Sequence, residues 1–233
     1  MKSAASFASL ASLLDNVFSF AKGEHMIYRG QGGDYPLLPG VARKAPTFDL
    51  TNKEIFALAE LRRLRADDIL IPADDWGLTT YAQHFGMPTR LLDWSHNPLV
   101  SIWFAIQSAS REKSDTAHVY LLRCVPQIVL GNPSSKKVHE IEQVWVIDPP
   151  FNNDRIRAQA GCFTVHPYTN RSNKYLAVDE DALCSKNLLL LTIPESAFAR
   201  MNSELDALGV NANRIYADFA GLCNYVAWRY LQP

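Results

Sequence analysis

The chain has 233 residues, and 23 Lys and Arg against 24 Asp and Glu give it a formal net charge of −1. Hydrophobic residues make up 48% and charged residues 20%, a globular composition that excludes an intrinsically disordered chain. The near-neutral balance gives no overall attraction to nucleic acid or to an anionic membrane. Binding of a polyanion would therefore need a local cluster of positive side chains.

Residues 1–22 imitate a signal peptide, because Lys2 precedes an apolar run, but Asp15 and Asn16 interrupt that run. Apolar residues recur there at helical spacing, at Phe7, Leu10, Leu14, Val17 and Phe18. We therefore expect residues 1–22 to form a docking helix and residues 23–233 to form one domain. No run approaches the roughly 20 apolar residues that span a bilayer, so we expect no membrane partner. Four widely spaced cysteines without a clear export signal lead us to expect a cytoplasmic protein.

Short strands are separated by irregular loops, with helices early and late in the chain, which predicts an α+β fold. Strands are predicted over residues 26–29, 91–94, 118–124, 144–148, 162–166 and 188–193. Helices are predicted over residues 51–66, 79–85, 97–109 and 218–231.

Two of these helices have a clear apolar period. In 51–66, Thr51 or Asn52 is expected to be the N-cap. The residues that follow the helical period there are Ile55, Leu58, Leu61 or Ala59, and Leu64 or Arg65. In 218–231 the residues expected to pack on one side are Phe219, Leu222, Val226 and Tyr230.

The cysteines are far apart in the chain and include no CxxC pair, so they predict reduced thiols and no zinc site. They are Cys124, Cys162, Cys184 and Cys223. His118, His139 and His166 likewise have no spacing typical of metal ligands. We expect no bound metal.

Familiar catalytic motifs are absent: the GQGG of 30–33 lacks the GxGxxG spacing, no GxSxG occurs, and His139-Glu140 lacks the second His of HExxH. The segment YRGQ at 28–31 is more informative. Arg29 at a strand end presents a planar, charged fork suited to phosphate or carboxylate. Gly30 after it is expected to let a ligand approach the backbone.

A second segment, YAQHFGMPTRLLDWSHNPLVSIWFA at 81–105, is unusually polar for a core-forming region. Together with YRGQ it closely resembles the FRG domain, a bacterial and phage family. RIRAQAGCF at 155–163 and DFAGL at 218–222 resemble the later elements of that family. The resemblance extends over residues 24–230.

The order of elements in the FRG family is similar to that of the mono-ADP-ribosyltransferases, which implies a split β-sheet core with flanking helices. It also implies that NAD+ is the substrate, with Arg29 on the pyrophosphate and Ser95 at the nicotinamide ribose. Gln159 takes the position of the transferase glutamate. The residues implied in NAD+ binding are Tyr28, Arg29, Gly30, Gln31, His84, Arg90, Asp93 and Trp94. Trp94, Phe85 or Tyr28 is the expected stacking partner.

The departure from the transferases is Gln159, which supplies no charge for an oxocarbenium-like sugar. Three alternatives follow: Gln159 suffices, a carboxylate from Asp93, Glu142 or Asp154 replaces it, or the site binds without turnover. The resemblance implies an effector or toxin that modifies RNA, DNA or protein, in antiphage defence or with a neutralising antitoxin. The rival interpretations are a non-catalytic nucleotide- or partner-binding module and an NAD+-hydrolysing toxin.

Structural roles are the alternative for several of these residues. In the structural interpretation, Arg29 is a buried residue that pairs with Asp93. The structural roles expected for Asp93 are to cap the helix that starts near Asn97 or to pair with Arg90. His84 and His96 are either ligand neighbours or hydrogen-bonded structural residues. The cations available to a nucleic-acid acceptor are Arg43, Lys44, Arg62, Arg63 and Arg65.

Overall fold

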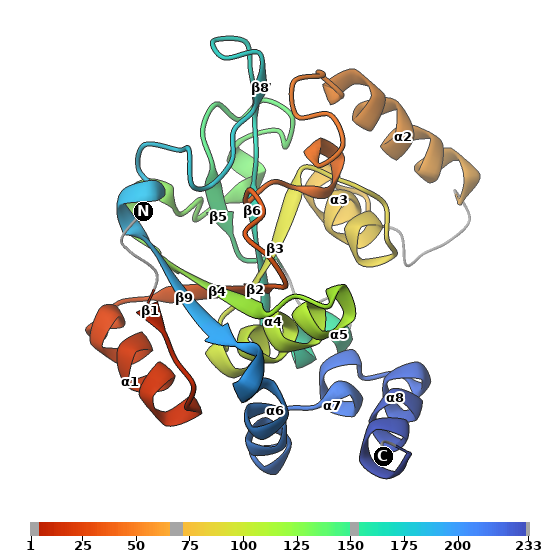
Figure 1. The fold of residues 1–233 in the computed structure, drawn as a ribbon. Helices are drawn as coiled ribbons and strands as arrows, with labels where there is room; N and C mark the ends of the chain where they lie inside the picture. Colours follow the sequence, from red (N-terminus) through yellow and green to blue (C-terminus); the bar gives the residue numbers. More distant parts are fainter. Residues whose placement is uncertain (1–4, 66–71, 150–153, 232–233) are drawn as a thin grey trace.

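The computed structural model describes residues 5–65, 72–149 and 154–231. Seven strands form one mixed sheet in the order β1-β9-β4-β2-β3-β6-β5, and β7 pairs with β8 in a separate hairpin (Figure 1). The strands are β1 (Ala5–Ser6), β2 (Met26–Gln31), β3 (Leu91–Ser95), β4 (Thr116–Arg123), β5 (Trp145–Ile147), β6 (Gly161–Val165), β7 (Tyr168–Thr169), β8 (Lys174–Tyr175) and β9 (Leu188–Pro194). The helices are α1 (Leu10–Ala21), α2 (Thr51–Leu64), α3 (Asp75–His84), α4 (Pro98–Glu112), α5 (Asp154–Ala158), α6 (Phe198–Ala207), α7 (Ala212–Tyr216) and α8 (Phe219–Tyr230). The α+β prediction is confirmed.

The sheet divides where β2 meets β3. These two strands share a single registered pair, Tyr28 with Ser95. By contrast, β2 pairs with β4 along the whole of 26–31, and β3 pairs with β6 along the whole of 91–95. In Figure 1, β4 and β2 run across the view, while β3 and β6 run more nearly from top to bottom. At the joint between the two halves, the end of β3 therefore lies next to the middle of β2.

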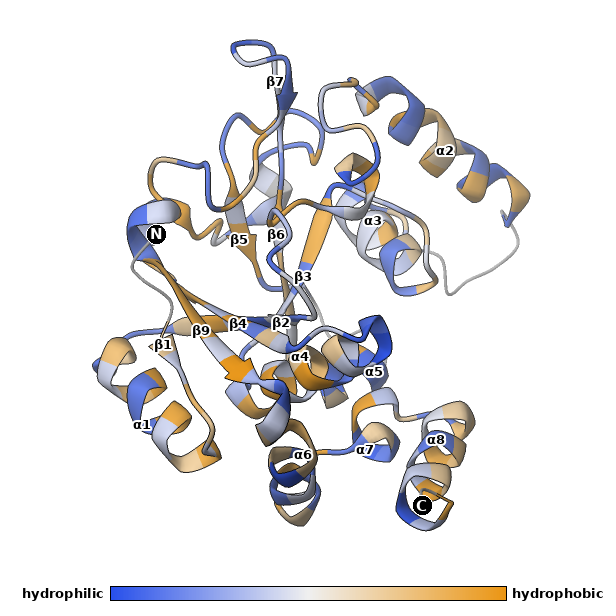
Figure 2. Cartoon of the chain, viewed as in Figure 1, coloured by the Kyte–Doolittle hydropathy of each residue, from blue (hydrophilic) through white to orange (hydrophobic). Residues whose placement is uncertain are grey.

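Both faces of the central strands are buried, and β4 shows how the alternation of side chains produces this. Ala117, Val119 and Leu121 belong to the core under α1, α4 and α6. Tyr120 and Leu122 belong to the opposite core, which β3, β5 and β6 also form. Successive side chains of a strand point to opposite faces, so one strand contributes to both cores. Figure 2 shows these central strands in predominantly hydrophobic colours.

The packing of α4 on β2 requires glycine at Gly30. A Cβ there would collide with the carbonyl oxygen of Ser101 and would lie 2.5 Å from the backbone nitrogen of Ala105. The need for glycine at this position therefore comes from the contact with α4, and the expected approach of a ligand to the Gly30 backbone stays a prediction. Asn97 caps this helix by accepting a hydrogen bond from the Leu99 amide, and the helix continues to 112, three residues beyond the prediction.

At the N-terminal end, α1 packs on the core under α4 and α6. Leu10, Leu13, Val17 and Ala21 are buried, whereas Phe18 is 62% exposed. Of the helix predicted over residues 1–22, residues 5–6 form β1 instead, and residues 1–4 lie outside the described part of the chain. Of the five residues that the helical spacing selected, Phe7 precedes α1 and Phe18 is on the exposed face.

The start of α2 agrees with the prediction, but its cap and its buried face do not. The N-cap is Leu50, which makes no side-chain hydrogen bond, and the Asp49 carboxylate accepts one from the Thr51 amide. Ile55 and Leu64 are 41% and 62% exposed. The next helix, α3, begins four residues earlier than predicted. Its N-cap is Asp74, whose side chain accepts a hydrogen bond from the Gly77 amide.

The last helix, α8, differs most from its prediction. Its four expected packing residues are 79%, 38%, 43% and 75% exposed, in the order Phe219, Leu222, Val226 and Tyr230. The helix instead packs on α7 through Gly221, where a Cβ would lie 2.7 Å from the Ala212 carbonyl oxygen. An apolar stripe identifies one side of a helix, but it does not determine which side meets the neighbour.

Within the described residues, every helix is too short or too polar to cross a lipid bilayer.

Candidate functional site

A cleft of about 530 Å³ opens at the joint between the two halves of the sheet. Its walls come from β2, β3 and β6, and from the facing sides of α3, α4, α5 and α7. Eight of the residues expected at the site line it: Tyr28, Arg29, Gly30, His84, Asp93, Trp94, Ser95 and Gln159. The fold thus brings together the residues expected on the first, second and third elements of the site.

Arg29 is half-buried in this cleft. Its Nη1 donates a hydrogen bond to the carbonyl oxygen of Asp93 at 2.7 Å, so the contact expected between the two residues is made with the backbone. Its Nε is buried and has no hydrogen-bond partner. Burial lowers the pKa of Arg29 to about 10, which leaves the guanidinium charged at neutral pH. A charged group with an unused donor is suited to an anionic ligand.

Positive charge dominates the cleft although the whole chain is nearly neutral. Its described lining residues include one carboxylate, Asp93, and four arginines, Arg29, Arg43, Arg111 and Arg155. This excess favours anions, and the low-dielectric walls strengthen it. The arrangement is the local cluster that the net charge of the chain did not reveal.

Of the cations expected to meet nucleic acid, Arg43 lines the cleft. Arg62 and Arg63 lie on α2 and form ion pairs with Asp75 and Glu60, at 3.3 Å and 2.5 Å respectively.

Arg111 and Arg155 were not predicted from the sequence. Arg111 extends a helical stripe on α4 that includes Ser101, Phe104 and Ser108, all of which line the cleft. The predicted helix ended at residue 109, so the prediction left this arginine out. Helical spacing from Ser101 would have placed Arg111 on the cleft side had the helix been extended by one turn.

Ser95 and Gln159 line the cleft, but both side chains are hydrogen-bonded to backbone groups. The Ser95 hydroxyl donates to the Gln159 carbonyl oxygen at 2.6 Å and accepts from the Asn97 amide at 2.9 Å. The Gln159 side-chain amide donates to the Ile215 carbonyl oxygen on α7 at 3.2 Å. These bonds hold β3, β6 and α7 together around the cleft.

Asp93 is the carboxylate that faces the cleft. Its side chain is exposed and accepts a hydrogen bond from Gln83 Nε2 at 3.2 Å. Gln83 is itself held by the Thr89 hydroxyl, which donates to its side-chain oxygen at 2.7 Å. The other two candidates, Glu142 and Asp154, are not among the described lining residues. The capping role considered for Asp93 is filled by the asparagine that begins α4.

His84 lies at the end of α3 and lines the same cleft. Burial, followed by the charge of Arg155, lowers the pKa of His84, and the Asp93 carboxylate opposes this shift. The neutral imidazole is therefore favoured near pH 7, where one ring nitrogen accepts a proton.

The expected stacking residues offer little ring surface. Trp94 is 4% exposed, and its indole N–H donates to Thr164 Oγ1 at 2.9 Å. Tyr28 is also buried, and Phe85 is exposed but is not among the lining residues. Tyr216 is a lining aromatic residue outside the expected set, and the Arg155 guanidinium lies over its ring, 5.0 Å from the ring centroid. Sequence reasoning missed it.

Two residues expected to bind the cofactor have structural roles instead. Arg90 is 1% exposed, and its Nε donates to the Glu54 carboxylate at 2.8 Å. Gln31 is buried and donates through Nε2 to the Tyr35 carbonyl oxygen at 2.7 Å. Neither lines the cleft, so the assignment of both to the cofactor is corrected.

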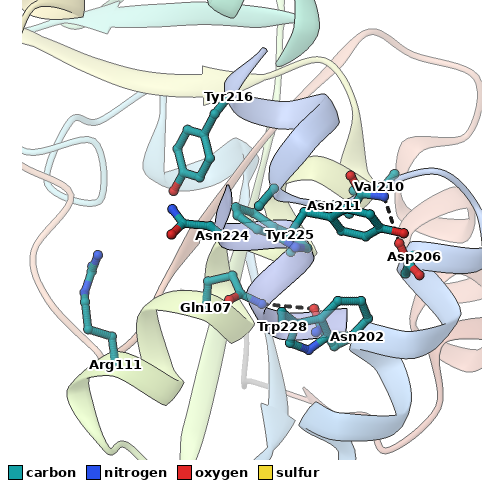
Figure 3. A pocket seen from close by; sticks show the side chains of 12 residues that line it. Gln107, Arg111, Asn202, Asp206, Val210, Asn211, Tyr216, Asn224, Tyr225 and Trp228 are labelled. Carbon is teal, nitrogen blue, oxygen red and sulfur yellow. Dashed lines mark hydrogen bonds between the residues drawn. The ribbon is translucent and has the colours of Figure 1, made fainter. Parts of the chain in front are cut away.

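A smaller pocket of about 230 Å³ adjoins the cleft and shares Gln107, Arg111 and Tyr216 with it. It lies between α4, α6, α7 and α8 (Figure 3). Gln107 Nε2 donates to Asn202 Oδ1 at 2.9 Å, as the dashed line in the figure shows. Amide and aromatic side chains dominate this lining, so the pocket extends the cleft with neutral polar groups.

In a comparison with known families, residues 24–114 match the FRG domain. The FRG match runs from just before β2 to just after α4, and it includes Arg29, His84, Asp93 and Ser95. No curated protein and no solved structure gives a significant match to the chain.

The FRG match covers less of the chain than the motif resemblance, which continued to residue 230. Arg155, Gln159 and Tyr216 lie outside it, although they line the same cleft. The FRG segment therefore supplies the β2, β3 and α4 walls, and the later part of the chain completes the site.

Proposed function

We propose that the cleft binds NAD+ and transfers its ADP-ribosyl group to an acceptor. The observation that carries this proposal is the meeting of Arg29, Asp93 and Ser95 in one arginine-rich cleft. A volume of about 530 Å³ falls within the range of roughly 300–1,000 Å³ found for ligand pockets. Arg29 and Arg155 are the donors proposed for the pyrophosphate, because one guanidinium group can donate two parallel hydrogen bonds to a phosphate.

In the proposed reaction, a nucleophile of the acceptor attacks C1′ of the nicotinamide ribose. The bond to nicotinamide breaks, and nicotinamide leaves with the electron pair. The developing positive charge on the sugar requires an anion, and the Asp93 carboxylate supplies it. Neutral His84 takes the proton that the acceptor loses. In this arrangement Asp93, rather than Gln159, has the catalytic charge.

The second candidate is a nucleotide-binding module without turnover. The observation that favours it is the engagement of the Ser95 hydroxyl and the Gln159 side chain with backbone groups. Neither group is then free to orient a ribose unless these bonds open. An NAD+ hydrolase is the third candidate, with water in place of the acceptor.

Calorimetry with NAD+ tests the binding step. We expect Arg29→Ala to weaken NAD+ binding by about 10- to 150-fold, since a hydrogen bond to a charged group contributes about 1.5–3 kcal/mol. Arg200→Ala is the matched control, because that arginine pairs with Glu204 on α6 and is not among the cleft residues. Equal affinity of the wild type and Arg29→Ala for NAD+ would overturn the proposal.

Incubation of labelled NAD+ with cell extract separates the three candidates. Transfer of label to a macromolecule, lost in Asp93→Asn, supports the transferase. Release of nicotinamide without transfer supports the hydrolase. Binding of NAD+ that stays intact supports the module.

A further inference from the structure

Next to the arginine-rich cleft, which Cys162 also lines, ligand atoms of three chemical kinds meet at one end of the strands β3, β6 and β5. His96, Asp148 and Cys162 each offer one atom, and these atoms all lie within 4.8 Å of one another. His96 follows β3, Asp148 follows β5, and Cys162 is on β6. Because β3 and β5 both pair with β6, the register of the sheet brings these distant positions together.

His96 has the geometry of a supported metal ligand. Its Nε2 lies 2.7 Å from Asp148 Oδ1, and its Nδ1 lies 3.1 Å from His25 Nε2. The two imidazoles are stacked, with centroids 5.0 Å apart and planes 17° apart. Histidines that bind metals usually donate their other ring N–H to a neighbouring acceptor, which fixes the tautomer and the ring orientation. His25 is placed to be that acceptor, with His96 Nε2 directed at the ion.

The sulfur at this edge is sheltered from solvent. Cys162 is fully buried, whereas Asp148 has a side chain 56% exposed. The ion would therefore be reached from the solvent side and be held on the other side by the thiolate.

We propose that His96, Asp148 and Cys162 bind one Zn²⁺ ion, with His25 as a positioning residue behind His96. Nitrogen, oxygen and sulfur ligands of this kind are those that Zn²⁺ takes in proteins. A thiolate disfavours Mg²⁺ and Ca²⁺, which prefer oxygen ligands. Three protein ligands leave a fourth position of the tetrahedron for water. Ligand spacing along the chain does not reveal this site, because its members are 52 and 14 positions apart in the sequence.

The test uses the full chain, freed of metal by a chelator and titrated with Co²⁺ as a spectroscopic substitute for Zn²⁺. We expect one equivalent to bind, with the visible bands of tetrahedral Co²⁺ and a sulfur-to-cobalt charge-transfer band. Cys162→Ser should abolish the charge-transfer band, and Asp148→Asn should weaken binding at least tenfold. His25→Gln should keep the sulfur band but weaken binding by about 10- to 100-fold, the usual effect of losing an outer partner. Zn²⁺ should displace the cobalt.

Cys223→Ser is the matched control, because Cys223 is an exposed free thiol on α8. It should bind Co²⁺ as the wild type does. If Cys162→Ser fails to fold, Asp148→Asn tests the same ion, since that side chain is largely exposed. Absence of saturable Co²⁺ binding, binding without a sulfur band, or binding unchanged in Asp148→Asn overturns the proposal. The readouts require no NAD+, so they stand or fall independently of the transferase proposal.

Discussion

The ion pair between Arg90 and Glu54 is buried away from solvent, with side chains 1% and 0% exposed. Glu54 also accepts a hydrogen bond from the Arg90 amide at 2.8 Å, so both of its oxygens are used. His139 lies 3.6 Å from the same carboxylate. This pair connects α2 to the start of β3. Removing one partner would leave the other charge buried without compensation, which strongly lowers the stability of the folded state. Its contribution is structural, next to the cleft rather than within it.

Glu54→Ala should lower the free energy of unfolding by about 3–5 kcal/mol, because it leaves Arg90 buried without a counter-charge. The control is Glu60→Ala, which removes the exposed pair with Arg63 and should cost less than about 1 kcal/mol. Urea denaturation of the two variants measures both values. Equal losses would contradict a buried, uncompensated arginine.

At the scale of elements, the contact of α4 with β2 shapes the cleft. α4 supplies one wall, and Gly30 lets its backbone lie directly on the strand that bears Arg29. Gly32, just after β2, likewise allows close contact with the next turn of α4, since a Cβ there would lie 2.7 Å from the Ser108 carbonyl carbon. A larger side chain at either position must push the helix away from the strand.

Gly30→Ala should lower the free energy of unfolding by about 1–3 kcal/mol, the usual cost of overpacking. The same displacement of α4 should weaken NAD+ binding. Gly131→Ala is the control, because a Cβ at that position has no neighbour within 4 Å. Its effect should stay within about 0.5 kcal/mol. Thermal unfolding of both variants is the measurement, and an unchanged melting temperature in Gly30→Ala would refute the close contact.

For the whole molecule, two buried histidines make the stability depend on pH. Burial, with the neighbouring arginine charges, lowers the pKa of His139 and of His166 to about 4. His166 Nδ1 donates to the Leu176 carbonyl oxygen at 2.7 Å, and its Nε2 accepts from the Thr164 hydroxyl at 2.9 Å. That hydroxyl in turn accepts the N–H of Trp94. The neutral tautomer is thus built into the core.

The unfolded chain binds these protons near pH 6.5, whereas the folded chain binds them near pH 4. Stability therefore rises with pH in this window and is lost as the pH falls from about 6.5 to 4. The loss should be on the order of 3 kcal/mol for each histidine, at 1.36 kcal/mol per pKa unit. Denaturation across this range measures it, and His166→Gln should reduce the slope. A flat profile in the wild type would contradict neutral buried imidazoles.

Local physics explains why much of this protein is readable from its sequence. Short apolar runs between irregular loops predicted β3, β4, β6 and β9, and the Asn97-Pro98 pair predicted the start of α4. The motifs selected Arg29, which is inside β2 rather than at the expected strand end, and Ser95, which ends β3; both line the cleft. These features depend on neighbours within a few residues, so the chain itself specifies them.

Contacts between distant residues were decided by the tertiary structure alone. Arg90 faces Glu54, 36 positions away, rather than the cleft. Arg111, Arg155 and Tyr216 reach the cleft because α4, α5 and α7 converge on it. His96, Asp148 and Cys162 come together because β3 and β5 both pair with β6 in a fixed register. Local patterns in the sequence predicted most of the central strands, the starts of α2 and α4, and Arg29 as a site residue, although β2 continues two residues beyond Arg29. The tertiary structure decided which charges are buried as pairs and which face a ligand, because burial depends on partners that no local pattern encodes.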